Sequence, residues 1–371
     1  MKKIFLVLLL SAAFSQALSP EHYQKQVEIL RNLDIDPSFM SDSIFVWQRQ
    51  ELESKHAGVL IRAMGKFSQI TPMIRKILAL EEIPEEILYL AMVESGLEVR
   101  SVSNAKAVGV WQFMKPTANK LGLRVDAYVD ERMDLVKSTH AAAAYLKELR
   151  AEFGKWYLAL LAYNCGNGKL RAAIKRAGGD DLALLLDGDK KYLSLETRNF
   201  MRKILTLAFL ANDRDFLLQK DASLMNYALH NDFVRVDIPS SVALKDLARG
   251  AGMDLATLKK YNPQFRHSFT PPGEGYYMYI PLSKVAFFEK NFKNLKFAKV
   301  DTRIPSTRIY VVKSGDSLYK IAKAHNVSVE NIRELNKIKK NHLSIHQKLI
   351  IPIKESKNAK TKISYAKMRS Y

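Results

Sequence analysis

The sequence has little cysteine and no apolar run long enough to span a membrane. Its 371 residues include one cysteine, Cys165, so a disulfide within the chain is excluded. We expect this thiol to be shielded, as a small residue of the core. The eight histidines show no pairing at metal-ligand spacing and there is no CxxC motif, so we predict no metal site and no cofactor. We also predict no transmembrane span.

Acidic residues are scarce relative to basic ones. The chain has 38 Asp and Glu against 58 Lys and Arg, which gives a net charge of +20. The basic residues are scattered along the whole chain, so we expect no nucleic-acid partner. An acidic extracellular polymer or an envelope surface fits this charge better. A proteome that simply favours lysine would give the same balance, and that alternative stays open.

Residues 1–17 have the pattern of an export signal. A basic start, Met1-Lys2-Lys3, is followed by an apolar core over residues 4–10 and by small residues that end at Ala17. We therefore predict cleavage after Ala17 and an exported protein of the periplasm or cell envelope. No cysteine lies near the cleavage site, so we expect no lipid anchor.

The next two hundred residues have a helical pattern. Apolar residues recur at helical spacing, and glycines follow the ends of several of these segments. We predict an N-terminal helical extension over residues 18–70 and an all-α globule over residues 71–225. The Lys- and Asn-rich segment 286–307 is interpreted as a linker, and residues 354–371 as a basic tail.

Residues 234–282 and 308–353 repeat one layout. Each begins with a short β-branched strand, continues with two short helices, and closes with an apolar strand that ends in Ile-Pro. An alanine and an asparagine are fourteen residues apart in both copies: Ala248 and Asn262, Ala322 and Asn336. This pattern predicts an internal duplication of a small βααβ unit.

The second copy resembles the LysM domain. The residues that carry the resemblance are Tyr-Val-Val-Lys-Ser-Gly-Asp-Ser-Leu over residues 310–318, together with Asn336 and the closing Leu-Ile-Ile-Pro. The resemblance implies binding to polymers that contain N-acetylglucosamine, through the turn formed by Gly315, Asp316 and Ser317. The first copy has Ser-Ser-Val at residues 240–242 in place of this turn. We expect it to be a degenerate module that packs against its neighbour and binds no glycan.

Glu94 ends an almost wholly apolar run over residues 87–93 and precedes Ser95-Gly96. Such a run is typical of a buried helix. A carboxylate at the C-terminal end of a buried helix is desolvated and lies at the negative end of the helix dipole, and both effects raise its pKa. A general acid that works near neutral pH needs such a pKa. On position alone, a glutamate that points to solvent is the alternative.

Four short segments resemble the soluble lytic transglycosylase fold, which is related to goose-type lysozyme. They read Glu-Ser-Gly from Glu94, Gly-Val-Trp-Gln-Phe-Met over residues 109–114, Ala-Tyr-Asn-Cys-Gly-Asn-Gly over 162–168 and Tyr-Leu-Ser-Leu-Glu-Thr-Arg-Asn-Phe over 192–200. With the C-terminal LysM unit, the whole chain resembles the membrane-bound lytic murein transglycosylase D family. The resemblance implies an all-α lysozyme-like catalytic domain followed by two small α+β modules of LysM type.

The same resemblance implies cleavage of the β-1,4 bond between N-acetylmuramic acid and N-acetylglucosamine in peptidoglycan, with 1,6-anhydro ends. Glu94 would act as both acid and base. The positions that match the family's substrate-binding groups are Ser103, Gln112, Tyr163, Asn164, Tyr192 and Glu196. We expect Asn164 to fix its loop through a backbone hydrogen bond, and an ion pair with Arg198 or another arginine is an equal alternative for Glu196.

Two aromatic residues and three departures from the family pattern remain. Trp111 and Phe113 could stack on sugars, although core packing is favoured for Phe113. Lys106, Cys165 and Ser194 stand where the family commonly has Gly, Ala and Pro. Two rival functions are a goose-type muramidase, which is a hydrolase, and a non-catalytic peptidoglycan-binding scaffold. Peptidoglycan glycan strands are the predicted partner in each case.

Overall fold

The computed structural model describes residues 20–55, 70–220, 233–292, 297–302, 307–336, 338 and 343–352. The predicted export signal and basic tail lie outside these residues. The chain divides into two compact units, Met1–Val300 and Asp301–Tyr371, and each is described by itself.

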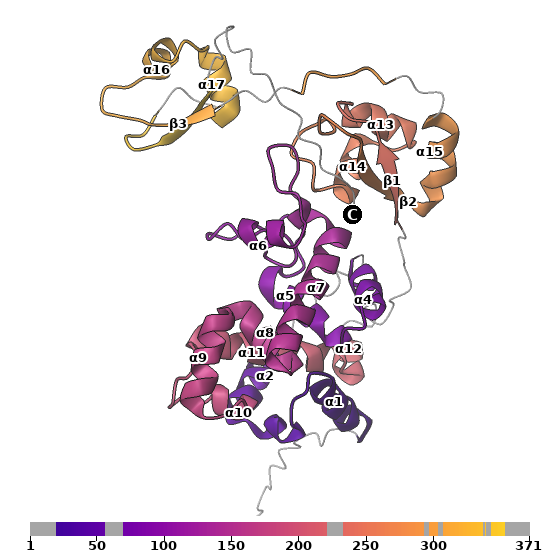
Figure 1. The fold of residues 1–371 in the computed structure, drawn as a ribbon, viewed down its shortest axis with the longest axis vertical. Helices are drawn as coiled ribbons and strands as arrows, with labels where there is room; N and C mark the ends of the chain where they lie inside the picture. The colour runs from indigo at the N-terminus through magenta and orange to yellow at the C-terminus, as the bar shows by residue number, and fades with distance from the viewer. Residues whose placement is uncertain are drawn as a thin grey trace, which may run out of the picture. The chain divides into compact units, whose positions relative to one another are not determined.

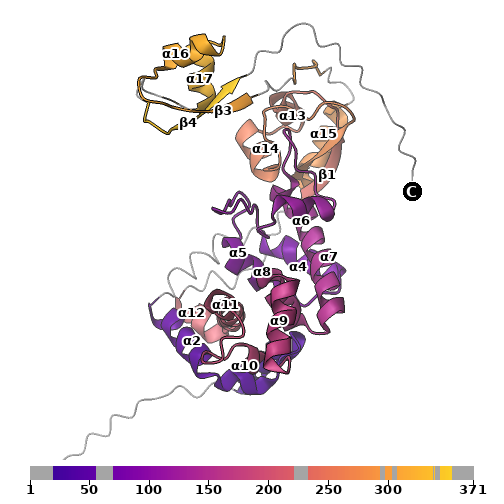
Figure 2. The same ribbon diagram turned by 60° about the vertical axis from the view of Figure 1, so that its left-hand side comes forward.

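The first unit is helical as far as residue 220 (Figures 1 and 2). Its α-helices are α1 (Pro20–Asn32), α2 (Ser43–Lys55), α4 (Thr71–Leu80), α5 (Leu88–Ser95), α6 (Lys115–Lys120), α7 (Leu135–Phe153), α8 (Trp156–Cys165), α9 (Asn167–Ala177), α10 (Leu182–Leu185), α11 (Leu195–Ala211) and α12 (Arg214–Lys220). Short 3-10 helices are η1 (Pro37–Ser41), η2 (Glu85–Ile87) and η3 (Glu131–Met133).

The core of this helical part is built on α5, α8 and α11. The apolar sequences of α5 and α8 carry no polar stripe, so both helices are buried on most sides. Helix α11 contacts α5, α8 and α2, and α7 contacts α8 and α4. One continuous cluster of buried side chains joins them, with Leu90, Leu160 and Ile204 fully excluded from solvent. The arrangement places the C-terminal ends of α5 and α8 in a fixed frame.

Specific residues begin and end the helices of this frame. Asp134 accepts a hydrogen bond from the Lys137 amide and so begins α7. Ser194 does the same for α11 through the Thr197 amide, which explains how serine serves where the family commonly has proline. Gly96 and Gly154 end α5 and α7 in the left-handed conformation, with φ of 58° and 84°.

Both predicted βααβ units are present. The first contains β1 (Phe233–Ile238), α13 (Leu244–Gly250), α14 (Leu255–Tyr261) and β2 (Tyr276–Pro281), and the second β3 (Thr307–Val311), α16 (Leu318–Ala324), α17 (Val329–Asn336) and β4 (Lys348–Pro352). In each unit the two strands pair antiparallel, with Val236 opposite Met278 in the first and Ile309 opposite Ile350 in the second.

The two asparagines that defined the repeat make the same three hydrogen bonds. The Asn262 amide nitrogen donates to the carbonyls of Leu258 and Tyr279, and its oxygen accepts from the Tyr279 amide at 2.7 Å. Asn336 bonds Ile332 and Ile350 in the same way, again with 2.7 Å to the amide. In both units this side chain ties the second helix to the closing strand.

The linker predicted over residues 286–307 is wrong in its first part. Residues Val285–Phe292 form helix α15, which follows a 3-10 turn, η5 (Leu282–Lys284). Phe288 of this helix is 3% exposed and belongs to the core of the first βααβ unit. The helix packs on α13, and Gly252, which follows α13, leaves room for the ring of Phe287. The apolar side chains of α15 pack on this core, and this packing makes residues 285–292 a helix despite the Lys and Asn content that suggested a linker.

Within the residues that the structure describes, no helix combines the length and apolar character needed to cross a membrane.

Candidate active site

Glu94 lies one residue before the end of α5, and its side chain is partly buried. Burial raises its pKa to about 7, and the negative charge of Glu196 adds to the rise. Among the described residues no hydrogen bond to the carboxylate offsets these two effects. The neighbouring Ser95 hydroxyl donates to the Val110 carbonyl at 2.8 Å and so ties the end of α5 to the next segment of the site.

That next segment, residues 101–113, folds back on itself through two β-bridges. Val108 pairs with both Val102 and Phe113. Ser103 closes the tip, because its hydroxyl accepts from the Ala107 amide at 3.0 Å and its own amide donates to the Ala107 carbonyl. Lys106 adopts φ of 69°, the left-handed conformation that explains why glycine is common there in the family. Ser103 therefore has a structural bond besides any role toward substrate.

Gln112 is also in the left-handed region, with φ of 49°. Its side-chain nitrogen donates to the Gly109 carbonyl at 2.7 Å, and its partly exposed amide oxygen remains able to accept. Gly109 itself has φ of 84°, and a Cβ there would lie 1.9 Å from the Arg132 carbonyl oxygen. Only glycine fits this close approach of two backbone segments.

Tyr163, near the end of α8, joins this segment to the helix core. Its hydroxyl donates to the Trp111 carbonyl at 2.6 Å. Burial raises the pKa of Tyr163 well above its ordinary value, with a further contribution from the charge of Glu94. Tyr163 is therefore a neutral hydrogen-bond donor, and it lies close enough to Glu94 for the carboxylate charge to raise its pKa.

Trp111 and Phe113 are core residues. Trp111 is fully buried and its indole nitrogen donates to the Thr139 hydroxyl at 3.0 Å, so the prediction that it could stack on sugars is wrong. Phe113 is 3% exposed, and its ring centroid lies 6.2 Å from that of Tyr163. An aromatic residue beside a polar motif gives no signal in the sequence that separates these two roles.

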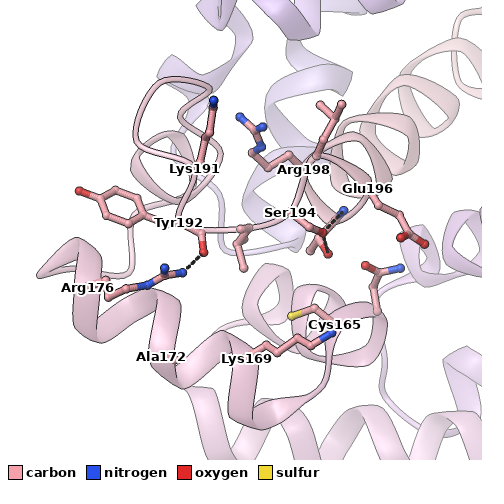
Figure 3. Close-up of a pocket in the computed structure, with 13 residues that line it drawn as sticks. Cys165, Lys169, Ala172, Arg176, Lys191, Tyr192, Ser194, Glu196 and Arg198 are labelled. Carbon is pink, nitrogen blue, oxygen red and sulfur yellow. Dashed lines mark hydrogen bonds between the residues drawn. The ribbon is translucent and has the colours of Figure 1, made fainter.

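A cleft of about 890 Å³ lies between α9 and the start of α11 (Figure 3). Cys165 and Lys169 stand on one wall, opposite Ser194 and Glu196. Cys165 is only half-buried and faces this cleft, so the prediction of a shielded core thiol is wrong. Burial raises the pKa of its thiol, which keeps it in the neutral form.

Two further sequence-predicted residues, Asn164 and Tyr192, line the same cleft as Glu196. Glu196 is exposed, whereas Arg198 is buried and donates to the Asp187 carbonyl at 3.0 Å. No ion pair of Glu196 is present within the described residues, so the alternative of a pair with Arg198 does not hold. Tyr192 accepts a hydrogen bond from Arg176 through its backbone carbonyl, and no side-chain hydrogen bond of Asn164 is found in the described part of the chain.

The cleft is lined by basic residues that sequence reasoning missed. Lys169, Arg176 and Lys191 contribute side chains to it. Lys169 and Arg176 lie seven residues apart on α9 with Ala172 between them, a spacing that places all three on one face of a helix. The spacing of Lys169 and Arg176 in the sequence is a signal that could have identified this basic helix face. Across the described residues, no three His, Cys, Asp or Glu side chains are grouped to hold a metal ion.

In the second unit, the three residues predicted to bind glycan form the turn before α16. Gly315 has φ of 83°, and Asp316 accepts from the Lys313 amide at 2.7 Å and from the Tyr310 hydroxyl at 2.8 Å. Ser317 begins α16 by accepting from the Lys320 amide. The backbone of Gly315 and the side chains of Asp316 and Ser317 shape the turn, and a glycan contact at these positions stays a prediction.

Comparison with protein families divides the chain in the same order as the fold. Residues 72–185 match the transglycosylase SLT domain, and residues 310–352 match the LysM domain. Residues 232–296, which include α15, match the LysM-like domain of lytic transglycosylase MltD. The chain thus carries an SLT domain followed by two domains of LysM type. The all-α domain with two small α+β modules, predicted from the sequence, is confirmed.

Individual relatives point the same way. The chain is 28% identical over 303 residues to the membrane-bound lytic murein transglycosylase D of Escherichia coli (strain K12), across 79% of this chain and 64% of that protein. It is 37% identical over 121 residues to the peptidoglycan transglycosylase gp16 of Escherichia phage T7, across 32% of this chain and 9% of that protein. The predicted resemblance to the lytic murein transglycosylase D family is confirmed.

Among solved structures, the 70 kDa soluble lytic transglycosylase of Escherichia coli aligns with a TM-score of 0.35 and 17% identity, over 56% of this chain and 32% of that one. The lytic transglycosylase Slt of Pseudomonas aeruginosa aligns with a TM-score of 0.31 and 20% identity, over 40% and 24%.

The raised pKa of Glu94 predicts how glycan cleavage depends on pH. If protonated Glu94 is required, kcat/KM should fall as pH rises through about 7, because the acid form is lost. Glu196→Gln removes a negative charge that favours the acid form. The pKa of Glu94 should then be lower, and the fall in kcat/KM should begin at lower pH.

The measurement is a pH profile of kcat/KM on a short soluble glycan. Glu148→Gln, which removes an exposed carboxylate paired with Lys120, is the matched control and should leave the profile in place. A profile of Glu196→Gln that superimposes on the wild-type profile would exclude the electrostatic coupling between Glu196 and Glu94.

Proposed function

We propose that this chain is a peptidoglycan lytic transglycosylase. It would cleave the β-1,4 bond between N-acetylmuramic acid and N-acetylglucosamine and leave 1,6-anhydromuramic acid ends. The observation that carries the proposal is Glu94, a partly buried carboxylate with a pKa near neutrality, within the residues that match the transglycosylase SLT domain. The names of the Escherichia coli and phage relatives support the same substrate.

The proposed reaction needs one group that first gives and then takes a proton. Protonated Glu94 donates to the glycosidic oxygen as its bond to the anomeric carbon breaks. The resulting carboxylate then removes the proton of the muramoyl 6-hydroxyl, whose oxygen forms the new bond to the anomeric carbon. A pKa near 7 suits both steps, because neither protonation state is strongly favoured at neutral pH. No water is consumed.

The residues around Glu94 would bind the substrate or hold the groups that bind it. Gln112 offers an amide oxygen, and Asn164 offers a side chain that lines the cleft, and both could bind sugar or N-acetyl groups. Tyr163 would act indirectly, because its hydroxyl already donates to the Trp111 carbonyl and so holds the backbone before Gln112. The basic residues of the cleft would favour the carboxylates of peptide stems on the glycan.

A goose-type muramidase is the second candidate, and one observation favours it. The negative charge of Glu196 contributes to the raised pKa of Glu94, which supports a second carboxylate near the proposed acid. In an inverting hydrolase such a carboxylate activates a water, and the two carboxyl groups lie about 6.5–9.5 Å apart. Glu196 would then be the base, and the product would carry a reducing end.

We further propose that the protein acts in the cell envelope and that its second LysM-type domain binds the glycan of the wall. The support is the LysM match over residues 310–352 and the description of the Escherichia coli relative as a membrane-bound murein enzyme. Linking a weak glycan-binding domain to the catalytic domain raises the effective concentration of enzyme on an insoluble substrate.

The nature of the product tests the proposed reaction. Purified sacculi digested with the protein should release muropeptides with 1,6-anhydro ends, which are lighter by one water than hydrolysis products. The fragments are measured by mass spectrometry. Predominantly reducing muramic acid ends would reject the transglycosylase and favour the muramidase with Glu196 as base.

The same digestion with Glu94→Gln is the control for the catalytic group. Glutamine is nearly isosteric with glutamate but cannot donate and then recover the proton. Loss of a positioned general acid costs about 10²–10⁴-fold in rate. A variant that keeps more than about a tenth of wild-type turnover would remove Glu94 from its proposed role.

Removal of the second unit tests wall binding. Its core, which includes Val312, Ile332 and Ile351, is separate from the others, so truncation before residue 308 should leave the first unit folded. We expect a smaller fraction of the protein to sediment with sacculi, and an unchanged rate on short soluble glycans. Sedimentation of both proteins is compared at low and high salt, because a purely electrostatic attraction is screened. Equal sedimentation of the two proteins at high salt would show that the unit binds no glycan.

A further inference from the structure

One buried arginine, Arg132, holds the part of segment 101–113 that runs from Ser103 to Phe113 and carries Gln112. Nη1 of Arg132 donates to the carbonyls of Lys106 at 3.1 Å and Phe113 at 3.0 Å. Arg132 is 6% exposed, so these bonds are shielded from water. The arginine thus joins the turn at Lys106 to the end of the segment at Phe113 and fixes the two relative to each other.

Arg132 is in turn oriented by a buried carboxylate. Its Nε and Nη2 atoms each lie 2.8 Å from an oxygen of Asp130, a two-point pairing that sets the plane of the guanidinium group. Asp130 is 2% exposed. A buried carboxylate at this position needs its full set of partners, because removing one leaves part of a desolvated charge uncompensated.

The second cation on Asp130 comes from the first LysM-type domain. Nη2 of Arg266, in the loop between α14 and β2, lies 2.8 Å from Oδ2 of Asp130. The backbones also pair here: Val129 bridges Phe265, and the Asp130 amide donates to the Gln264 carbonyl at 2.9 Å. The domain therefore contributes backbone hydrogen bonds as well as a charge to this part of the SLT domain.

A second set of contacts fixes the same join. Three tyrosines of β2 donate hydroxyl hydrogen bonds to buried carboxylates at the start of α7 and in η3. Tyr276 bonds Glu131 at 2.7 Å, and Tyr277 and Tyr279 bond the two oxygens of Asp134 at 2.5 and 3.1 Å. All three rings are under a tenth exposed. A domain held in this way is a rigid support for the residues it contacts.

We infer that the first LysM-type domain acts as a positioning element of the active site. Arg266, through Asp130 and Arg132, holds segment 103–113 in the conformation that presents Ser103 and Gln112. The effect of this role on catalysis rests on the proposed function. The segment has two non-glycine residues in the left-handed region, Lys106 and Gln112, and such conformations persist only where surrounding contacts hold them. Arg266 is thus a positioning residue that touches no substrate.

The test is Arg266→Ala in the full chain, with two readouts. The first is hydrogen exchange of the bonded amides of Ala107, Val108 and Phe113, which report opening of the segment. We expect these amides to exchange about tenfold faster in the variant, because the tether of Arg132 is loosened. The second readout is steady-state kinetics on a short soluble glycan. We expect kcat to fall about tenfold with little change in KM, because small misplacements of positioning groups slow the chemical step.

Two further variants separate positioning from general effects. Arg249→Ala makes the same change in the same domain, but Arg249 is exposed and pairs with Asp246, so both readouts should match wild type. Arg266→Lys keeps the charge beside Asp130 and should restore most of kcat. If Arg266→Ala does not fold, Arg266→Gln, which keeps one donor, is measured in its place against the same controls.

The inference would be overturned if Arg266→Ala lowered the melting temperature but left hydrogen exchange at Ala107, Val108 and Phe113 unchanged and kcat within about twofold of wild type. Exchange and kcat are measured well below the melting temperature. The domain would then contribute stability alone. Hydrogen exchange needs no turnover, so a failure of the proposed transglycosylase activity would leave this part of the test intact.

Discussion

The site depends on keeping one carboxylate, Glu94, poorly solvated at the end of a buried helix. The apolar sequence of α5 forces the helix into the core, and Gly96 ends it two residues after the carboxylate. Burial and the charge of Glu196 then move its pKa to about 7. An exposed glutamate in the same sequence position would be ionised at neutral pH and could not act as an acid. The chemistry that we propose follows from this one constraint.

Most of the surrounding structure fixes groups relative to that carboxylate. The Ser95 hydroxyl joins α5 to Val110, and the Tyr163 hydroxyl joins α8 to Trp111, so two helices of the core hold adjacent residues of segment 101–113. Arg132 also holds this segment, at Lys106 and Phe113, and the first LysM-type domain supports Arg132 through Arg266 and Asp130. The first copy of the repeat, which has Ser-Ser-Val at residues 240–242 where the second has the Gly-Asp-Ser turn, is thus part of the frame around the site.

Local patterns in the sequence predicted much of this fold and site. The apolar run before Glu94 and the repeated spacing that ends at Asn262 and Asn336 reflect short-range physics, and the structure reproduces both. The pairing of Arg266 with Asp130 joins residues 136 positions apart, and no periodicity reports it. Trp111 was misassigned for a similar reason, because its indole nitrogen bonds Thr139 of α7, 28 residues away in the sequence.

The most direct test of this account is the titration of Glu94 itself. In protein labelled with ¹³C at the glutamate side-chain carboxyl carbon, the signal missing from Glu94→Gln identifies Glu94, and its shift is followed against pH by NMR. We predict a midpoint at about 7. A midpoint close to 4.5, the ordinary value for a glutamate, would contradict it, because Glu94 would then be fully ionised wherever the protein works near neutral pH.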